Sequence, residues 1–334
     1  MKHNFFEYKD NFAKYKHIKS NLLVGEIENI PNPKITIAIP TYKRAVLISD
    51  SINSILNQVK FDDYEIIIID NEATQEENET EKLMKQYNNS KILYYKNEEN
   101  VGMFGNWNRC IELARGKYIT ILNDDDWLEE EFLYEMNKQI EGSKMIICDY
   151  ITKDFRKIKN EKQDIIIKRI LKKIYERAKK INKVHKLKLE DFFYGFRGLS
   201  SLGIIFERES MLKLGGYNEE YIPSCDYIFH TIYFKNYGGK YLKKELANCR
   251  LQENESMKEE VQKGFLKKDY LFRESLINYL GNKNNLSKIN TEMTKMYENS
   301  LNELWNSKKN KKVRKVNKIC EMKIKMKRRM IRIF

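Results

Sequence analysis

The chain has 334 residues, of which 41% are hydrophobic and 33% charged, and its formal net charge is +14. This length and composition predict a folded protein with a substantial core. No run approaches 18 consecutive apolar residues, and the first ten residues lack the apolar core of a signal peptide. The five cysteines are dispersed, without the close pairs of a zinc site or redox motif, which fits reduced thiols and predicts a cytoplasmic protein.

The positive charge is concentrated in two segments. Residues 307–334 hold 13 Lys or Arg and one Glu, and residues 153–188 hold 15 Lys or Arg and 4 acids. The rest of the chain therefore has a net charge of −9. An acidic body with two basic segments is not the pattern of a protein that binds nucleic acid over its whole surface.

The first half of the chain alternates between two hydrophobic periodicities. We expect strands at residues 34–40, 64–70, 91–95, 118–122 and 144–151, and helices at residues 45–58, 79–87 and 107–114. These strands are apolar almost throughout, which is typical of strands covered on both faces. The alternation predicts an α/β fold with a mostly parallel sheet flanked by helices.

The two ends and the middle of the chain differ from this pattern. Residues 1–33 are polar and aromatic, and prolines at 31 and 33 mark a break before the first strand. Residues 151–190 are lysine-rich and predict a basic helical insertion. Strand character resumes at residues 199–206, and helices dominate after residue 255. We expect subregions of one compact unit.

An acidic run, Asn-Asp-Asp-Asp at residues 123–126, follows the strand expected at 118–122. Neighbouring carboxylates repel one another, and burying them is costly unless a positive group lies among them. A divalent cation with oxygen ligands is the usual solution. The alternative is an acidic cap on a helix that begins just after the run.

Polar residues also follow two other expected strands. Residues 40–44, Pro-Thr-Tyr-Lys-Arg, follow the first strand, and Asp70 with Asn71 follows the second. Ligands of open α/β sheets bind at the carboxyl ends of the strands, so these loops and the acidic run are expected to converge. Asp70 taken alone is equally consistent with a helix cap.

The order of these elements resembles a known family. Together with residues 100–109, Asn-Val-Gly-Met-Phe-Gly-Asn-Trp-Asn-Arg, and Ala-Arg-Gly-Lys-Tyr at 114–118, the chain from Lys34 to Phe132 resembles the nucleotide-sugar-binding half of a family 2 glycosyltransferase of the GT-A fold. A weaker resemblance covers residues 198–250, with Gly-Gly-Tyr-Asn-Glu at 215–219 and Ser-Cys-Asp-Tyr at 224–227.

The resemblance implies a division of the chain and a Rossmann-like GT-A sheet with a helical C-terminal extension. The implied subregions are an N-terminal extension at 1–33, a nucleotide-sugar-binding half at 34–150, the basic insertion at 151–190, an acceptor and catalytic-base half at 191–254, and a helical region with a basic tail at 255–334.

The resemblance also implies roles for particular residues. The nucleotide-binding residues would be Pro40, Thr41, Tyr42, Asp70, Asn100, Gly102, Asn106, Arg109, Asn123 and Asp124. The family's Asp-X-Asp motif falls on residues 123–125, with Asn in the first position, so Asp125 is the expected metal ligand and Asp126 a second candidate. Asp226 matches the catalytic base, and its structural alternative is a helix N-cap. Gln252 stands where the family often has a metal-contacting His.

These roles imply inverting transfer of a sugar from a nucleotide sugar, a UDP-sugar by resemblance, to a hydroxyl of a glycan or lipid-linked acceptor. Mn²⁺ or Mg²⁺ on Asp125 would neutralise the leaving diphosphate, and Asp226 would accept the hydroxyl proton. A non-enzymatic nucleic-acid-binding protein is one alternative. A sugar nucleotidyltransferase is another, but it would need a glycine-rich basic loop after the first strand.

The tail and five other residues complete the expectations. Apolar residues from Val316 to Ile333 form one helical stripe among Lys and Arg. Residues 307–334 therefore predict a basic amphipathic helix at an anionic membrane surface, here the inner face of the plasma membrane, or else a tail packed on its own domain. His230, Trp107 and Trp127 are expected to be structural, and Gly215-Gly216 to form a tight turn that by resemblance leads toward the acceptor.

Overall fold

The structure is a computed structural model that describes residues 4–87, 89–155, 184–195, 200–252, 258–281, 283–305 and 314–333. Most of the expected basic insertion at 151–190, namely residues 156–183, lies outside the described residues. Within the described ranges, no helix combines the length and the apolar character that a membrane span needs.

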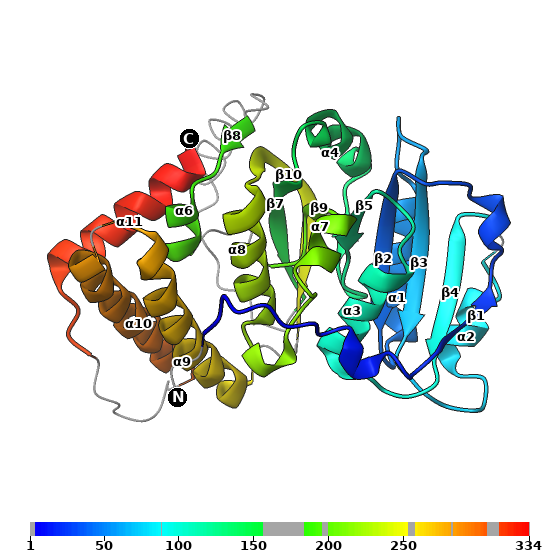
Figure 1. Ribbon diagram of the computed structural model, residues 1–334, viewed down its shortest axis with the longest axis horizontal. Helices are drawn as coiled ribbons and strands as arrows, with labels where there is room; N and C mark the ends of the chain where they lie inside the picture. Colours follow the sequence, from blue (N-terminus) through cyan, green and yellow to red (C-terminus); the bar gives the residue numbers. More distant parts are fainter. Residues whose placement is uncertain are drawn as a thin grey trace, which may run out of the picture.

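The described residues form one ten-stranded sheet with the order β1-β4-β3-β2-β5-β9-β7-β10-β6, and β8 pairs with β10 (Figure 1). The strands are β1 Ser20–Val24, β2 Ile35–Thr41, β3 Tyr64–Asp70, β4 Ile92–Asn97, β5 Tyr118–Ile121, β6 Trp127–Leu128, β7 Met145–Asp154, β8 Val184–Lys186, β9 Ile204–Glu207 and β10 Lys240–Leu251. The sequence predicted β2 to β5, β7 and β9, but not the other four strands.

The sheet has a parallel half and a mixed half. β4, β3, β2 and β5 run parallel, and β10 runs parallel to β7. β1, β6, β8 and β9 are joined to their neighbours in antiparallel fashion. The α/β fold is confirmed, and the parallel arrangement holds for the N-terminal half. The sequence did not predict β1, β6 and β8, and it predicted β9 without its direction. Most of these strands are short or only partly buried.

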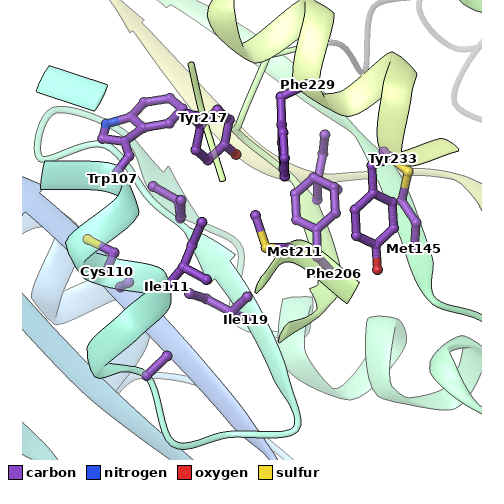
Figure 2. Close-up of a cluster of buried hydrophobic side chains, with 14 of the residues drawn as sticks. Trp107, Cys110, Ile111, Ile119, Met145, Phe206, Met211, Tyr217, Phe229 and Tyr233 are labelled. Carbon is purple, nitrogen blue, oxygen red and sulfur yellow. The ribbon is translucent and has the colours of Figure 1, made fainter. Parts of the chain in front are cut away.

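The helices are α1 Ala45–Leu56, α2 Glu79–Met84, α3 Gly102–Leu113, α4 Phe132–Ile140, α6 Leu189–Phe193, α7 Arg208–Lys213, α8 Cys225–Tyr237, α9 Glu259–Leu276, α10 Lys283–Trp305 and α11 Lys318–Ile333. Alternate residues of the buried strands enter two different cores. Ile37 of β2 belongs to the core with α1 and α4, whereas Ala38 belongs to the core with α3, α7 and α8. Figure 2 shows the second core, where Trp107, Met211 and Phe229 converge.

A helical layer lies outside α8, as the expected C-terminal extension (Figure 1). Helices α9, α10 and α11 pack together around a third core that contains Phe272, Met293 and Ile324, with Ile228 of α8. Ile324 on α11 is fully buried. One face of the tail helix therefore packs on its own domain.

The N-terminal residues cross the molecule from the helical layer toward β1 (Figure 1). Phe5 is buried and packs edge-on against Phe272 of α9, with ring centroids 5.4 Å apart. Asn11 donates from its backbone and from its side chain to the carbonyl of Gly215, both at 2.9 Å. This segment joins the two halves of the molecule.

Strand order creates a switch point between β2 and β5. The chain runs from β2 to β3 and β4 on one side, then returns to place β5 on the other side of β2. A switch point of this kind, at the carboxyl ends of the strands, is where open α/β sheets bind ligands.

Candidate functional site

The acidic run lies at this switch point. β5 ends at Ile121, and Trp127–Leu128 is a short strand paired with Ala247 and Asn248 of β10. Helix α4 begins only at Phe132. The helix-cap alternative for the acidic run is therefore wrong, because an extended segment separates the acids from the helix.

Asp124 and Asp125 share one guanidinium group. Arg44 Nη1 donates to Asp124 Oδ1 at 3.2 Å and to Asp125 Oδ2 at 2.9 Å. Thr41 Oγ1 donates to Asp124 Oδ2 at 2.8 Å. Burial raises the pKa of Asp124 to about 6, although Arg44 and Thr41 act in the opposite direction. Arg44 is a candidate site residue to which the sequence alone assigned no role, and its position just after the neighbouring strand was the available signal.

Asp126 is directed toward β10. Its Oδ1 accepts from the Arg250 backbone N–H at 2.9 Å, and its Oδ2 accepts from Asn123 Nδ2 at 3.0 Å. Burial, followed by the charge of Asp125, raises the pKa of Asp126 to about 7. Asp126 Oδ1 thus holds the loop onto β10, while its Oδ2 makes a hydrogen bond within the acidic run. Asp125 is the acid with an oxygen, Oδ1, that makes no hydrogen bond or ion pair with the described residues.

The donor set limits the kind of metal site. The described residues contain no group of three or more His, Cys, Asp or Glu side chains arranged to hold a metal. Asp125 can supply one carboxylate, and Mg²⁺-type ions commonly bind one or two carboxylates together with substrate phosphates and water. The residues fit a metal that binds jointly with a diphosphate, and they do not fit a closed site made only of protein ligands.

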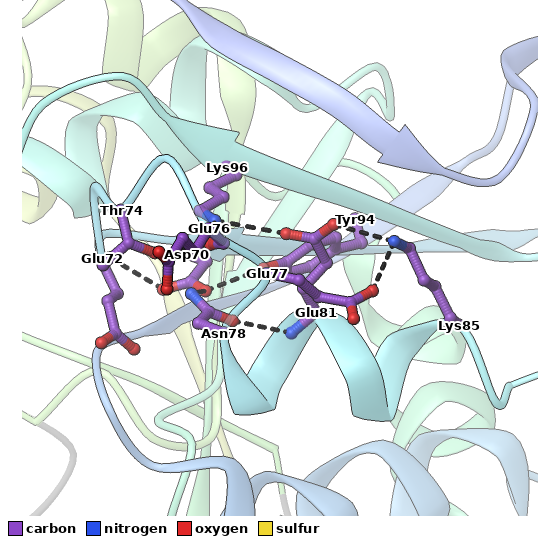
Figure 3. A network of polar contacts seen from close by, with 10 residues as sticks. All are labelled: Asp70, Glu72, Thr74, Glu76, Glu77, Asn78, Glu81, Lys85, Tyr94 and Lys96. Carbon is purple, nitrogen blue, oxygen red and sulfur yellow. Dashed lines mark hydrogen bonds and ion pairs between the residues drawn. The ribbon is translucent and has the colours of Figure 1, made fainter.

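Asp70 is fully buried at the end of β3 (Figure 3). Its oxygens accept from the Glu72 backbone N–H, from Asn78 Nδ2 and from Tyr94 Oη, each at 2.8 Å. Burial and the adjacent Asp70 charge raise the pKa of Tyr94. Asp70 therefore orders the loop between β3 and α2, and its contact with a nucleoside stays a prediction.

Asn71 joins the loops after β2, β3 and β4. Its backbone N–H donates to the Thr41 carbonyl at 2.9 Å, and its Oδ1 accepts from Asn97 Nδ2 at 3.0 Å. Its Nδ2 donates to Asn100 Oδ1 at 2.9 Å, and the same oxygen accepts from the Gly102 backbone N–H at 2.8 Å. These bonds fix the start of α3 at the edge of the sheet.

Two of the expected nucleotide-binding residues on α3 are turned into the protein. Asn106 is buried and donates to the carbonyl of Ile69 at 2.9 Å. Arg109 Nη2 donates to the carbonyls of Tyr15 and Ile18, at 2.9 and 2.8 Å. The expectation that Arg109 binds the nucleotide is therefore wrong. Arg109 lies two helical turns after the start of α3, and its guanidinium contacts the N-terminal segment instead of the loops at the strand ends.

The other expected contacts differ in exposure. Pro40 and Thr41 are buried within β2, while Asn123 is partly exposed beside Asp126. Tyr42 is 46% exposed, and the Lys43 ammonium lies 5.3 Å from its ring centroid. Tyr42, Asn100 and Gly102 are the exposed members of the predicted set. They lie in the loops after β2 and β4, where a nucleoside could be reached.

Asp226 lies in the first turn of α8, and the cap position is Ser224. Its Oδ1 accepts from the Tyr227 backbone N–H at 2.8 Å. Burial raises the pKa of Asp226 to about 7, and the charge of Asp269 acts in the same direction. Only two residues separate α8 from β10, so the two elements run in opposite directions and the start of α8 lies toward the end of the sheet at which β10 ends (Figure 1).

His230 and Trp107 are buried as expected, whereas Trp127 is only partly buried and lies 5.1 Å from the Arg250 guanidinium. His230 is fully buried, and its Nε2 is hydrogen-bonded to Tyr217 Oη at 2.9 Å. Trp107 lies in the core of Figure 2. Gly215 has φ +81°, and a Cβ there would lie 2.0 Å from the Lys9 carbonyl oxygen, so the glycine turn admits the N-terminal segment.

Comparisons with known proteins identify a family and several relatives. The model of the family described as Glycosyl transferase family 2 matches residues 36–200. An uncharacterized glycosyltransferase of Methanocaldococcus jannaschii is 34% identical over 128 residues, which cover 36% of this chain and 42% of that protein. The abequosyltransferase of Salmonella typhimurium is 34% identical over 117 residues, covering 34% of this chain and 35% of that protein.

A third relative is the GalNAc(5)-diNAcBac-PP-undecaprenol beta-1,3-glucosyltransferase of Campylobacter jejuni, 35% identical over 97 residues, which cover 29% of this chain and 31% of that protein. The matched segments thus span less than half the length of these relatives. Among solved structures, residues 1–349 of S. aureus TarS in complex with UDP-GlcNAc give a TM-score of 0.57 at 16% identity, covering 82% of this chain and 74% of that chain. This likeness concerns the fold, an α/β architecture of the GT-A type.

Proposed function

The chain belongs to glycosyl transferase family 2, and from that membership we propose that it transfers a sugar from a nucleotide sugar to a hydroxyl group of a glycan or lipid-linked acceptor. The observation that carries the proposal is the cluster of Thr41, Arg44, Asp124 and Asp125 at the switch point between β2 and β5. The Arg44 guanidinium can bind phosphate oxygens, and the uncontacted Oδ1 of Asp125 can bind a metal ion that a diphosphate also binds. The cluster therefore suits a diphosphate.

The donor would bind across the loops after β2 and β4. The exposed ring of Tyr42 offers a stacking surface for a base, and Asn100 with Gly102 borders the same edge. Arg44 would pair with the diphosphate, because guanidinium groups bind phosphate oxygens in bidentate fashion. UDP is the first nucleotide to test, since the sequence resemblance implies it.

The reaction requires that the negative charge of the leaving diphosphate is neutralised and that the attacking hydroxyl loses its proton. Mn²⁺ or Mg²⁺ bound by Asp125 would act as a Lewis acid on the departing diphosphate. Asp226 would accept the proton of the acceptor hydroxyl, and a base whose pKa is about 7 is well matched to neutral conditions. Direct attack by the acceptor in a single displacement would invert the anomeric configuration.

The acceptor class rests on a relative. The printed name of the Campylobacter jejuni protein describes a glycan on undecaprenyl diphosphate, and we extend a glycan or lipid-linked acceptor to this chain. A lipid-linked acceptor lies in a membrane, so the protein would bind peripherally at the inner face of the plasma membrane. Family membership favours this function over the nucleic-acid-binding alternative, and Pro-Thr-Tyr-Lys-Arg after β2 lacks the glycines that a nucleotidyltransferase loop would need.

Nucleotide binding tests the proposal directly. We expect one of UDP, GDP, CDP and dTDP, with Mn²⁺, to raise the unfolding temperature of the wild-type protein, because a ligand that binds only the folded state stabilises it. The increment should disappear with EDTA and in Asp125→Asn.

Asp62→Asn is the matched control, since the Asp62 side chain is 93% exposed and remote from the switch point. Its nucleotide response should equal that of the wild type. Absence of stabilisation by any of the four nucleotides at millimolar concentration would contradict the proposed function.

A further inference from the structure

We propose that the cavity between α6, α10 and α11 binds a membrane phospholipid with an anionic headgroup. One acyl chain would lie inside the cavity, and the phosphate would lie at its mouth. This role goes beyond the proposed function, because it concerns how the protein holds a membrane lipid and requires neither a nucleotide nor an acceptor.

The cavity has a size and an apolar floor that suit an acyl chain. Its volume is about 510 Å³, within the roughly 300–1,000 Å³ of small-molecule sites. Leu286 and Ile289 of α10 are 6% and 2% exposed, and they line the cavity together with Leu280, which precedes that helix. A hydrocarbon chain in contact with these side chains leaves water, which is favourable.

Polar contacts join the two walls that α6 and α11 provide (Figure 1). Lys327 Nζ of α11 donates to Glu190 Oε2 of α6 at 3.2 Å. Arg328 Nε donates to the carbonyl of Tyr194, just after α6, at 2.8 Å. These contacts fix the position of α11 relative to α6, so the cavity is formed before a lipid enters.

The mouth of the cavity opens beside an exposed apolar stripe of α11. This stripe consists of Ile319, Met322 and Met326, which follow one another at intervals of three and four residues and so share one face of the helix. Met326 also lines the cavity. An amphipathic helix on a membrane places its apolar face at the boundary of the acyl chains. A lipid of that membrane would therefore lie next to the mouth.

The charges at the mouth suit one phosphate group. Lys327 is paired with Glu190, whereas Lys323, one turn earlier, is exposed and makes no hydrogen bond or ion pair within the part of the chain that the structure describes. The two lysines and the glutamate give the lining a net charge of +1. A phosphodiester with one negative charge, as in phosphatidylglycerol, would neutralise it at Lys323.

A second cavity beside the first one matches such a lipid less well. Asp226 and Asp269 line it together with Arg273 and Arg328, so it has no excess of positive charge. None of the three residues of the exposed stripe lines it. Both the charge and the location therefore assign the lipid to the cavity between α6, α10 and α11.

Binding of dihexanoyl phosphatidylglycerol to the full chain, below the micelle concentration of this lipid, tests the site. We expect the lipid to shift the methyl NMR signal of Met326, because that side chain lines the cavity, and to leave the signal of Met322 unchanged. Glycerol 3-phosphate carries the phosphate without the acyl chains, and it should not bind at the same concentrations.

Two substitutions should each weaken lipid binding at least about tenfold. Lys323→Gln removes the ammonium group that would pair with the phosphate. Gly281→Phe places a ring in the cavity, and Gly281 tolerates a side chain because a Cβ there meets no atom within 4 Å. Lys325→Gln is the matched control, since it removes the same charge from the same helix outside the cavity.

The control variant should bind the lipid as the wild type does, and the unfolding temperature without lipid verifies that each variant is folded. No binding of the lipid to the wild type would overturn the site. Equal losses in Lys323→Gln and Lys325→Gln would also overturn it, because they would show a general attraction between the basic tail and the lipid. Glycerol 3-phosphate that binds as tightly as the lipid would assign the cavity to free phosphate compounds instead.

Discussion

The buried carboxyl groups of this protein are found in two different environments, one beside the Arg44 guanidinium and one, at Asp226, without a hydrogen-bonded cation. Arg44 lies between two carboxylates that would otherwise repel each other, with Asp124 and Asp125 at 3.2 and 2.9 Å. Asp226 has no such cation in hydrogen-bonding contact, and burial raises its pKa to about 7. Arg44 opposes the effect of burial on the pKa of Asp124, whereas no cation opposes it at Asp226, so the Asp226 carboxyl group can exchange a proton near neutral pH.

The raised pKa of Asp226 predicts the pH dependence of turnover. The ionised carboxylate is the active base, so kcat should rise with pH through a midpoint near 7, the pKa of the buried group. Asp226→Asn should lower kcat by about 10² to 10⁴ and remove this limb.

Release of the nucleoside diphosphate between pH 5 and 9 measures both effects, and NMR of the product gives its anomeric configuration. An Asp226→Asn variant that keeps the midpoint near 7 would assign the base to another group. Retention of configuration would exclude the single displacement.

Helix α11 has two apolar faces with different surroundings. Cys320 and Ile324 are 7% and 0% exposed against the domain, whereas Ile319, Met322 and Met326 are 62%, 66% and 54% exposed. The tail thus packs on its own domain and also keeps an exposed apolar stripe among lysines. Both sequence-based alternatives describe part of this helix, and contact with a membrane stays a prediction.

The exposed stripe predicts binding to anionic vesicles. We expect the wild-type protein to sediment with vesicles containing phosphatidylglycerol, more weakly at high salt, because lysines attract anionic lipids and the stripe inserts. Combined Ile319→Ser, Met322→Ser and Met326→Ser substitutions should abolish sedimentation.

Substitution is a sharper test than deletion of residues 307–334, because deletion would also uncover the core that Ile324 fills. Serine substitutions at the exposed Tyr8 and Leu23 serve as the control and should leave binding unchanged. Equal sedimentation of both variants would assign vesicle binding to other surfaces.

On the scale of the whole molecule, the N-terminal segment connects the sheet to the helical layer. Phe5 enters the third core, Asn11 binds the glycine turn after α7, and Tyr15 accepts from Arg109 of α3. A segment that looks like a separate extension in the sequence is therefore part of the globular structure.

The stability of the whole molecule should accordingly depend on Phe5. Phe5→Ala is expected to lower the free energy of unfolding by about 3–5 kcal/mol, because it leaves a cavity in a packed core. Tyr8→Ala, at a side chain that is 65% exposed, should change it by less than about 0.5 kcal/mol. Urea denaturation measures both, and a similar effect of the two substitutions would show that the segment is not anchored through Phe5.

Much of the fold was predictable because β2 to β5 and their helices carry strong local patterns. β10 was missed because Lys240, Lys243, Lys244, Glu245 and Arg250 give it no apolar run. It forms a strand through pairing with β7, which lies about 90 residues earlier in the chain. At the site, the strand-end positions of Thr41 and the acidic run were predictable, but the direction of Arg109 depended on which segment lies against α3.

The sequence by itself determined the buried strands, the helices between them and the polar residues at the strand ends, because these follow from hydrophobic periodicity over short distances. Only the tertiary structure decided that β5 lies beside β2, and so that Arg44 meets Asp124 and Asp125 some 80 residues later. It also decided that α11 packs on the helical layer and that Asp226 faces a cavity. Such contacts depend on strand order and on the shape of packed surfaces, which a local pattern does not encode.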